Sequence, residues 1–248
     1  MIPDAQAGWW AGDAPPDLPP LQPDTASEVP QHLDVLPDGR ETLVIGDVPR
    51  LADFTHPQGD NPHGFKGTCG LCSCEGVLRQ FGIEVTEADV VEHALRNGLC
   101  HVGDAPEECG GTTASMQAEI LADHGVPAHV EQCRSLEELA AAMERGHGVI
   151  VEANAGVLWD DAAYYDFGGS NHAVVVTGVA RDPGTGEIQG FYLNDSGSGQ
   201  AGRFIDAETM SVAWLDAGGV SVMTDVVRLS APKDSAQADS QAERRTAP

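Results

Sequence analysis

The chain has 248 residues and a formal net charge of −26, and Lys66 and Lys233 are its only lysines. So strong a negative field repels phosphate backbones and anionic lipid headgroups, which makes nucleic acids and membranes poor partners. No apolar run approaches the roughly 20 residues of a membrane span, and the first residues lack the basic and apolar parts of a secretory signal. We therefore expect a cytoplasmic protein, or one that is secreted without such a signal.

Composition divides the chain into three parts. Residues 1–40 are acidic, rich in proline and without apolar periodicity, which is typical of a disordered arm. The Trp9-Trp10 pair is the exception within it, and it fits either rings packed on the domain or a docking peptide. Residues 231–248 form a polar tail. One folded domain is expected over residues 41–230.

The first half of that domain has mainly helical patterns. Thr86 with Asp89, and Ser135 with Glu138, have the spacing of helix N-terminal capping pairs. Glycines follow the last periodic residues, as at helix C-termini. We predict a short strand over 42–45, followed by helices over 70–80, 86–98, 116–124 and 135–146.

The second half changes to β-branched runs separated by turn residues. Pro183-Gly184 lies in a turn between two such runs, which predicts an antiparallel hairpin. A helical half followed by an antiparallel β half indicates an α+β fold. We predict strands over 149–151, 172–179, 188–194 and 220–227.

Cys69 stands where the helix over 70–80 begins. The amides of a helix N-terminus stabilise a thiolate, the nucleophilic form of cysteine, by about 0.3–1 kcal/mol when exposed. Gly67 and Gly70 on either side allow backbone and substrate to approach closely. These features indicate a nucleophile, although a buried structural cysteine fits the same local pattern.

His172 begins the strongest strand, and Asp195 ends the strand that follows it across the turn. Antiparallel pairing puts that strand end beside that strand start, so the Asp195 carboxylate can accept a hydrogen bond from the imidazole and select its tautomer. Alternation along the strand points Asn194 to the other face, where it is expected to be dispensable. Together with Cys69, these residues predict thiol acyl transfer on an amide, with no cofactor and no metal.

These segments resemble those of papain-like cysteine peptidases. Residues 69–72, Cys-Gly-Leu-Cys, are similar to the nucleophile segment of that superfamily. Residues 172–178 with residues 192–195 resemble the papain-like peptidases that process double-glycine leader peptides, in which an Asp follows the strand, and also the papain-fold effector domains of bacterial toxins. The resemblance covers about residues 58–200. It implies a compact papain-like fold and a protein or peptide substrate.

Two features depart from the papain pattern. The interval from Cys69 to His172 is shorter than in papain, and His63 stands where the family has a glutamine of the oxyanion hole. Gln58 is the nearest glutamine and is the oxyanion-hole candidate, while the backbone N–H of Cys69 can donate in either case.

Peptide hydrolysis by Cys69, His172 and Asp195 is therefore the first functional hypothesis. The resemblance to toxin domains implies an alternative, a glutamine deamidase or transamidase that uses the same residues. A non-catalytic zinc- or protein-binding module is the third, because the chain is locally rich in zinc-ligand residue types. Those residues are Cys69, Cys72, Cys74, Cys100, His101 and Cys109. The sequence leaves the oligomeric state open.

Overall fold

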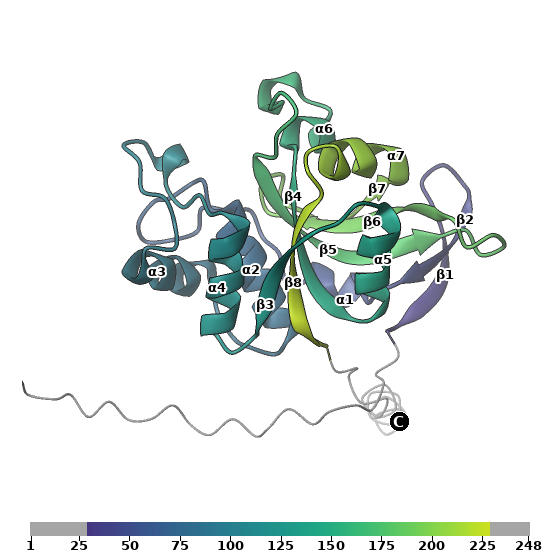
Figure 1. The fold of residues 1–248 in the computed structure, drawn as a ribbon, viewed down its shortest axis with the longest axis horizontal. Helices are drawn as coiled ribbons and strands as arrows, with labels where there is room; N and C mark the ends of the chain where they lie inside the picture. Colours follow the sequence, from purple (N-terminus) through teal and green to yellow (C-terminus); the bar gives the residue numbers. More distant parts are fainter. Residues whose placement is uncertain (1–28, 229–248) are drawn as a thin grey trace, which may run out of the picture.

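The computed structural model describes residues 29–228 of the chain. The Trp9-Trp10 pair and the tail over 231–248 lie outside the described residues. Helices and one antiparallel sheet make up the fold, so the α+β prediction is confirmed (Figure 1). The helices are α1 (Val48–Ala52), α2 (Cys69–Gln80), α3 (Glu87–Asn97), α4 (Ala114–Asp123), α5 (Leu136–Glu144), α6 (Ala155–Trp159) and α7 (Ala207–Met210), with a π-helical turn over Ser211–Leu215.

The strands form one sheet in the order β1-β2-β5-β4-β8-β3, and the β6–β7 pair joins it through β5. Strand β5 is central: β4 and β2 pair with successive parts of one edge, and β6 pairs along the other edge. The strands are β1 (Gln31–Val35), β2 (Glu41–Ile45), β3 (Ala128–Gln132), β4 (His147–Ala153), β5 (His172–Arg181), β6 (Ile188–Asp195), β7 (Gln200–Asp206) and β8 (Val220–Val227).

Strands β4 and β5 are buried on both faces, which explains their continuous apolar runs. Val149, Val151, Val174 and Val176 belong to one hydrophobic cluster, with α5 and the π-helical turn. Ile150, Ala173, Val175 and Val222 belong to a second cluster, with α2, α3 and α4. Because successive side chains of a strand point to opposite faces, one run of apolar residues supplies both cores.

Capping residues define the helix ends that the sequence predicts. The Thr86 hydroxyl accepts from the Asp89 N–H and the Asp89 carboxylate accepts from the Thr86 N–H, while Gly98 ends α3 with a φ of 69°. The Ser135 side chain likewise caps α5. Such reciprocal bonds satisfy backbone donors that have no partner within the helix.

Strand β1 differs from the prediction, because it lies inside the segment assigned to the arm over residues 1–40. It pairs antiparallel with β2, yet all five of its residues are exposed. This strand is held by backbone hydrogen bonds to β2 and has no buried face. Its sequence therefore lacks the alternation of apolar and polar residues by which a strand is recognised. In residues 29–228, none of the helices has the length and apolar character that a membrane span needs.

Candidate active site

Cys69 is the first residue of α2, and its side chain is partly exposed. The two other cysteines of the same helix, Cys72 and Cys74, are buried. Burial raises the pKa of each of these two thiols well above the ordinary value for cysteine, and nearby carboxylates raise it further. Of the three cysteines close together in sequence, Cys69 is therefore the one that solvent can reach.

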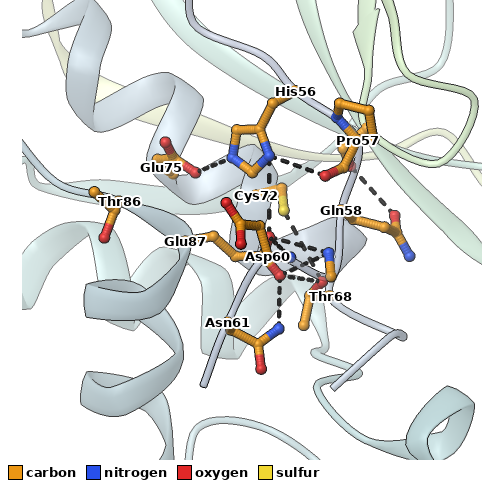
Figure 2. A network of polar contacts seen from close by, with 12 residues as sticks. His56, Pro57, Gln58, Asp60, Asn61, Thr68, Cys72, Glu75, Thr86 and Glu87 are labelled. Atoms are coloured by element: carbon orange, nitrogen blue, oxygen red, sulfur yellow. Dashed lines mark hydrogen bonds and ion pairs between the residues drawn. The ribbon is translucent and has the colours of Figure 1, made fainter. Parts of the chain in front are cut away.

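Glu87 connects the beginning of α2 to the preceding loop. Its buried carboxylate accepts hydrogen bonds from the Thr68 hydroxyl at 2.7 Å, the Asp60 N–H at 2.8 Å, and the Gly59 N–H and Asn61 side-chain amide at 2.9 Å each (Figure 2). Burial raises the pKa of Glu87, but these donors outweigh it and lower the pKa below its usual value. The ionised carboxylate thus orients the residue directly before Cys69.

His172 and Asp195 meet as the hairpin of β5 and β6 predicts. His172 Nε2 and Asp195 Oδ1 are 2.7 Å apart, and both side chains are only 4% exposed. The bond occupies Nε2 and leaves Nδ1 as the other ring nitrogen. Two of the three predicted residues are therefore in direct contact, and the third, Cys69, lines the same cleft as His172.

Burial by itself lowers the pKa of His172. The hydrogen bond to Asp195 and the proximity of the Cys69 thiol outweigh it, and the pKa rises to about 10. Burial likewise raises the pKa of Asp195, and its hydrogen bonds, that from His172 foremost, bring the pKa well below the usual range. The arrangement favours an imidazolium beside an ionised carboxylate.

Asp195 accepts more hydrogen bonds than sequence analysis anticipates. Oδ1 also accepts from the Gly197 N–H at 2.9 Å, while Oδ2 accepts from the Ser198 hydroxyl at 2.8 Å and from Trp159 Nε1 at 2.6 Å. The Trp159 ring meets the His172 ring edge-on, with centroids 5.0 Å apart. The Asp-Ser-Gly-Ser turn that follows β6 can be recognised in the sequence. The residues around Trp159 contain no motif that predicts its hydrogen bond to Asp195.

Close packing restricts this end of the sheet. A Cβ atom on Gly197 would lie 2.7 Å from His172 Cε1 and 2.9 Å from the Trp159 ring. On the opposite wall, a Cβ atom on Gly70 would lie only 2.0 Å from the Thr112 hydroxyl. Glycine at these two positions lets the imidazole and the start of α2 occupy their present places.

Cys69 and His172 line one cleft of about 380 Å³. Acidic side chains also line it, namely Glu107, Glu108 and Glu152, while no lysine or arginine among the described residues does. The lining of the cleft is therefore more acidic than basic.

Gln58 lies in the same cleft, eleven residues before Cys69 in sequence. Its Nε2 donates to the Lys66 carbonyl at 2.5 Å, and its Oε1 accepts from the Ser196 hydroxyl at 3.3 Å. Its backbone N–H donates to the Ser196 carbonyl at 2.9 Å. The loop that contains Gln58 therefore contacts Ser196, the residue that follows Asp195. His63, by contrast, is 3.0 Å from Glu92 and does not line the cleft.

Two further points concern Asn194 and the zinc alternative. Asn194 is buried, and its side chain donates to the Leu51 carbonyl at 2.7 Å and accepts from the Gly202 N–H at 2.9 Å. It therefore contributes to the packing of β6, while its dispensability for the reaction stays a prediction. Within the part of the chain that the structure describes, the six predicted zinc ligands over 69–109 do not supply three donors close enough to share an ion.

Comparisons with known proteins identify similar sequences and folds. The family model described as "Peptidase_C39 like family" matches residues 45–222. The solved structure of a C39-like peptidase from Bacillus anthracis has a TM-score of 0.52 and 18% sequence identity, and the alignment covers 75% of this chain and 98% of that chain. A double-glycine motif protease from an AMS/PCAT transporter, solved with its leader peptide, has a TM-score of 0.44 and 15% identity over 83% of this chain and 99% of that one.

No protein with a curated description matches the sequence. At such low identity the likeness to solved structures concerns the fold, whereas the family model covers most of the chain. It begins in β2 and ends in β8, so it includes both walls of the cleft. This chain belongs to the C39-like peptidase family.

Proposed function

We propose that this protein is a cysteine peptidase that hydrolyses peptide amide bonds, with Cys69 as nucleophile, His172 as general acid and base, and Asp195 as the residue that positions the imidazole. The observation that carries the proposal is the buried His172–Asp195 pair at 2.7 Å, with His172 and Cys69 lining one cleft. The pairing with an ionised carboxylate favours a charged imidazole, and Cys69 lies at the N-terminus of α2.

In the first half of the reaction, the Cys69 sulfur attacks the carbonyl carbon of the scissile amide. The C=O π electrons move to oxygen and form a tetrahedral oxyanion. The oxyanion then collapses, the C–N bond breaks, and His172 gives its Nδ1 proton to the leaving amine. The product is a thioester on Cys69.

In the second half, neutral His172 takes a proton from water, and the hydroxide attacks the thioester carbon. The C–S bond breaks, the acid product leaves, and the Cys69 thiolate and the His172 imidazolium are restored. Asp195 stabilises the imidazolium without taking its proton.

The oxyanion requires donors near Cys69. The first N–H groups of an α-helix have no partner within the helix, so the Cys69 N–H is available in the proposal. Gln58 supplies the second donor when its Nε2 leaves the Lys66 carbonyl and turns to the substrate. Gln58 and Cys69 line the same cleft as His172, so both proposed donors can reach a carbonyl group bound there.

The proposed substrate is a protein or peptide, because the chain belongs to a peptidase-like family and Cys69 and His172 line one cleft of about 380 Å³. A peptide mixture of random sequence, incubated with the full chain and read by mass spectrometry, tests the reaction. Cleavage at reproducible positions that is absent in Cys69→Ala and in His172→Ala supports the proposal. Glutamine deamidation without cleavage would instead support the deamidase alternative, and an unchanged mixture with no selective alkylation of Cys69 would reject thiol acyl transfer.

A further inference from the structure

A second group of potential ligands lies behind the cleft, and the proposed reaction does not use it. Cys72 and Glu75 stand three residues apart on α2, so they share one face of the helix. His56 approaches that face from the preceding loop (Figure 2). The Cys72 sulfur, a Glu75 oxygen and a His56 ring nitrogen all lie within 4.8 Å of one another. They represent the three kinds of donor that zinc binds in proteins.

The orientation of His56 suits a ligand. Its Nδ1 lies 3.0 Å from the Pro57 carbonyl oxygen, so Nδ1 carries a hydrogen and donates it. Its Nε2 points at Glu75 Oε2, 2.8 Å away. Metal-bound histidines almost always donate their second ring N–H to a carbonyl or carboxylate, which fixes the tautomer and the ring plane. The ring is thus already oriented with Nε2 toward the Glu75 carboxylate, and Cys72 lies close to both.

The surroundings are electrically negative and largely dry. Cys72 is 7% exposed, Glu75 3% and Glu87 1%. The positive groups facing Glu75 among the described residues are His56 and Arg79, whose guanidinium is 3.5 Å from Glu75 Oε1. Two buried carboxylates beside a cysteine create a site where a divalent cation gains Coulomb energy that water cannot screen well.

We propose that His56 Nε2, Cys72 Sγ and a Glu75 carboxylate oxygen form a binding site for a zinc-class divalent cation, with water as the fourth ligand. Tetrahedral Zn–N and Zn–S bonds of about 2.0 and 2.3 Å put ligand atoms about 3.5 Å apart. Small side-chain rotations therefore separate His56 from Glu75 and bring Cys72 inward. The Cys72 thiol releases its proton and the proton between His56 and Glu75 also leaves, so a bound Zn²⁺ replaces two protons.

The site would join two parts of the proposed machinery. His56 is two residues before Gln58 in the loop, and Cys72 is three residues after Cys69 on α2. A metal between them ties the loop that carries Gln58 to the helix that carries Cys69. The proposal itself stands apart from peptidase activity, because its measurement is spectroscopic.

Cobalt is the probe, because Co²⁺ replaces Zn²⁺ and a cobalt–thiolate bond has a charge-transfer absorption band. Full-length protein with the substitution Cys69→Ala, stripped of metal by a chelator, is titrated with CoCl₂, so the active-site thiol cannot contribute. We expect a thiolate band that saturates at one equivalent, is bleached by one equivalent of Zn²⁺, and is accompanied by a higher Tm.

Adding Cys72→Ser should remove the band, while adding Cys74→Ser, a buried cysteine two residues further on, should retain it. His56→Ala removes a partly exposed ring, and it should weaken Co²⁺ binding at least tenfold in a protein that still unfolds cooperatively. Absence of a thiolate band in the Cys69→Ala protein would overturn the proposal, as would a band that persists unchanged with Cys72→Ser or His56→Ala.

Discussion

Each wall of the cleft is supported by a buried carboxylate that accepts several hydrogen bonds, yet the two carboxylates bind different groups. Glu87, on the helical wall, accepts from loop amides and from Thr68, none of which titrates. Asp195, on the sheet wall, accepts from backbone, serine and tryptophan donors and also from the His172 ring. Both groups are carboxylates, so the difference between them comes from the hydrogen-bond donors that surround each one.

The difference has a physical basis. A buried carboxylate is stabilised only when donors replace the water it has lost, so both residues collect donors. Where every donor is a neutral amide or hydroxyl, the result is a rigid loop. Where one donor can itself carry a charge, the carboxylate also sets the pKa of that group. We therefore expect substitutions on the sheet wall to affect chemistry and those on the helical wall to affect mainly stability.

Replacement of Asp195 should cause the largest loss of peptide turnover. In the proposed mechanism, Asp195→Ala leaves the imidazole without its partner and lowers turnover by about 10³–10⁴-fold. It also leaves Trp159 and Ser198 without an acceptor, so the free energy of unfolding should fall. Asp195→Asn should retain part of the activity, because an amide oxygen can still accept from His172. Peptide turnover, or the alkylation rate of Cys69 by iodoacetamide, measures the effect.

Asn194→Ala is the matched control, one residue earlier on β6. It removes the hydrogen bonds to Leu51 and Gly202 and should lower the free energy of unfolding by about 1–3 kcal/mol. The alkylation rate of Cys69 should remain near that of the wild type. If Asn194→Ala abolished the reaction while Asp195→Ala preserved it, the proposed third residue would be wrong.

Gly197→Ala should have the next largest effect. Its Cβ atom would meet the His172 and Trp159 rings at distances that real structures do not show, so the imidazole must move. A displacement of about 1 Å at a reacting group costs roughly 10²-fold in rate. Gly184→Ala, in the turn between β5 and β6, has its nearest contact at 3.4 Å and should leave turnover unchanged. Equal turnover in both variants would show that the packing around His172 is not restrictive.

Glu87→Gln should affect stability more than chemistry. An amide side chain has one acceptor oxygen instead of two, so some of the donors from Gly59, Asp60, Asn61 and Thr68 lose their partner. We expect the free energy of unfolding, measured with urea, to fall by about 1–3 kcal/mol. The alkylation rate of Cys69 should change only a few-fold. A loss of rate as great as in Asp195→Ala would remove the distinction between the two walls.

The pH dependence of stability gives a separate test of the sheet wall. Because the folded-state pKa of His172 is about 10, above the ordinary 6.5, the folded protein binds this proton more strongly than the unfolded chain. The resulting stabilisation is complete below pH 6.5 and is lost as the pH rises through about 10. Urea unfolding between these values should give a decreasing free energy, with a smaller decrease in Asp195→Asn. An identical slope in both proteins would contradict the assignment.

Several features of this protein can be derived from its sequence because they depend on neighbouring residues. The capping pair Thr86 and Asp89, the glycine that ends α3, and the turn at Pro183-Gly184 all act over a few residues. The turn between two strands is enough to place Asp195 beside His172, since antiparallel pairing brings the end of one strand to the start of the other. The order of cysteine, histidine and aspartate along the chain then indicates the family.

Only the tertiary structure decides the rest. Trp159 reaches Asp195 across 36 residues, and Gln58 enters the cleft although its spacing from Cys69 departs from the family pattern. Glu87 orients the residue before Cys69 from a different helix. Contacts of this kind depend on how helices and strands pack against each other. Hydrophobic periodicity in a sequence predicts which face of a helix or strand is buried, but it does not predict which residues of other elements that face contacts.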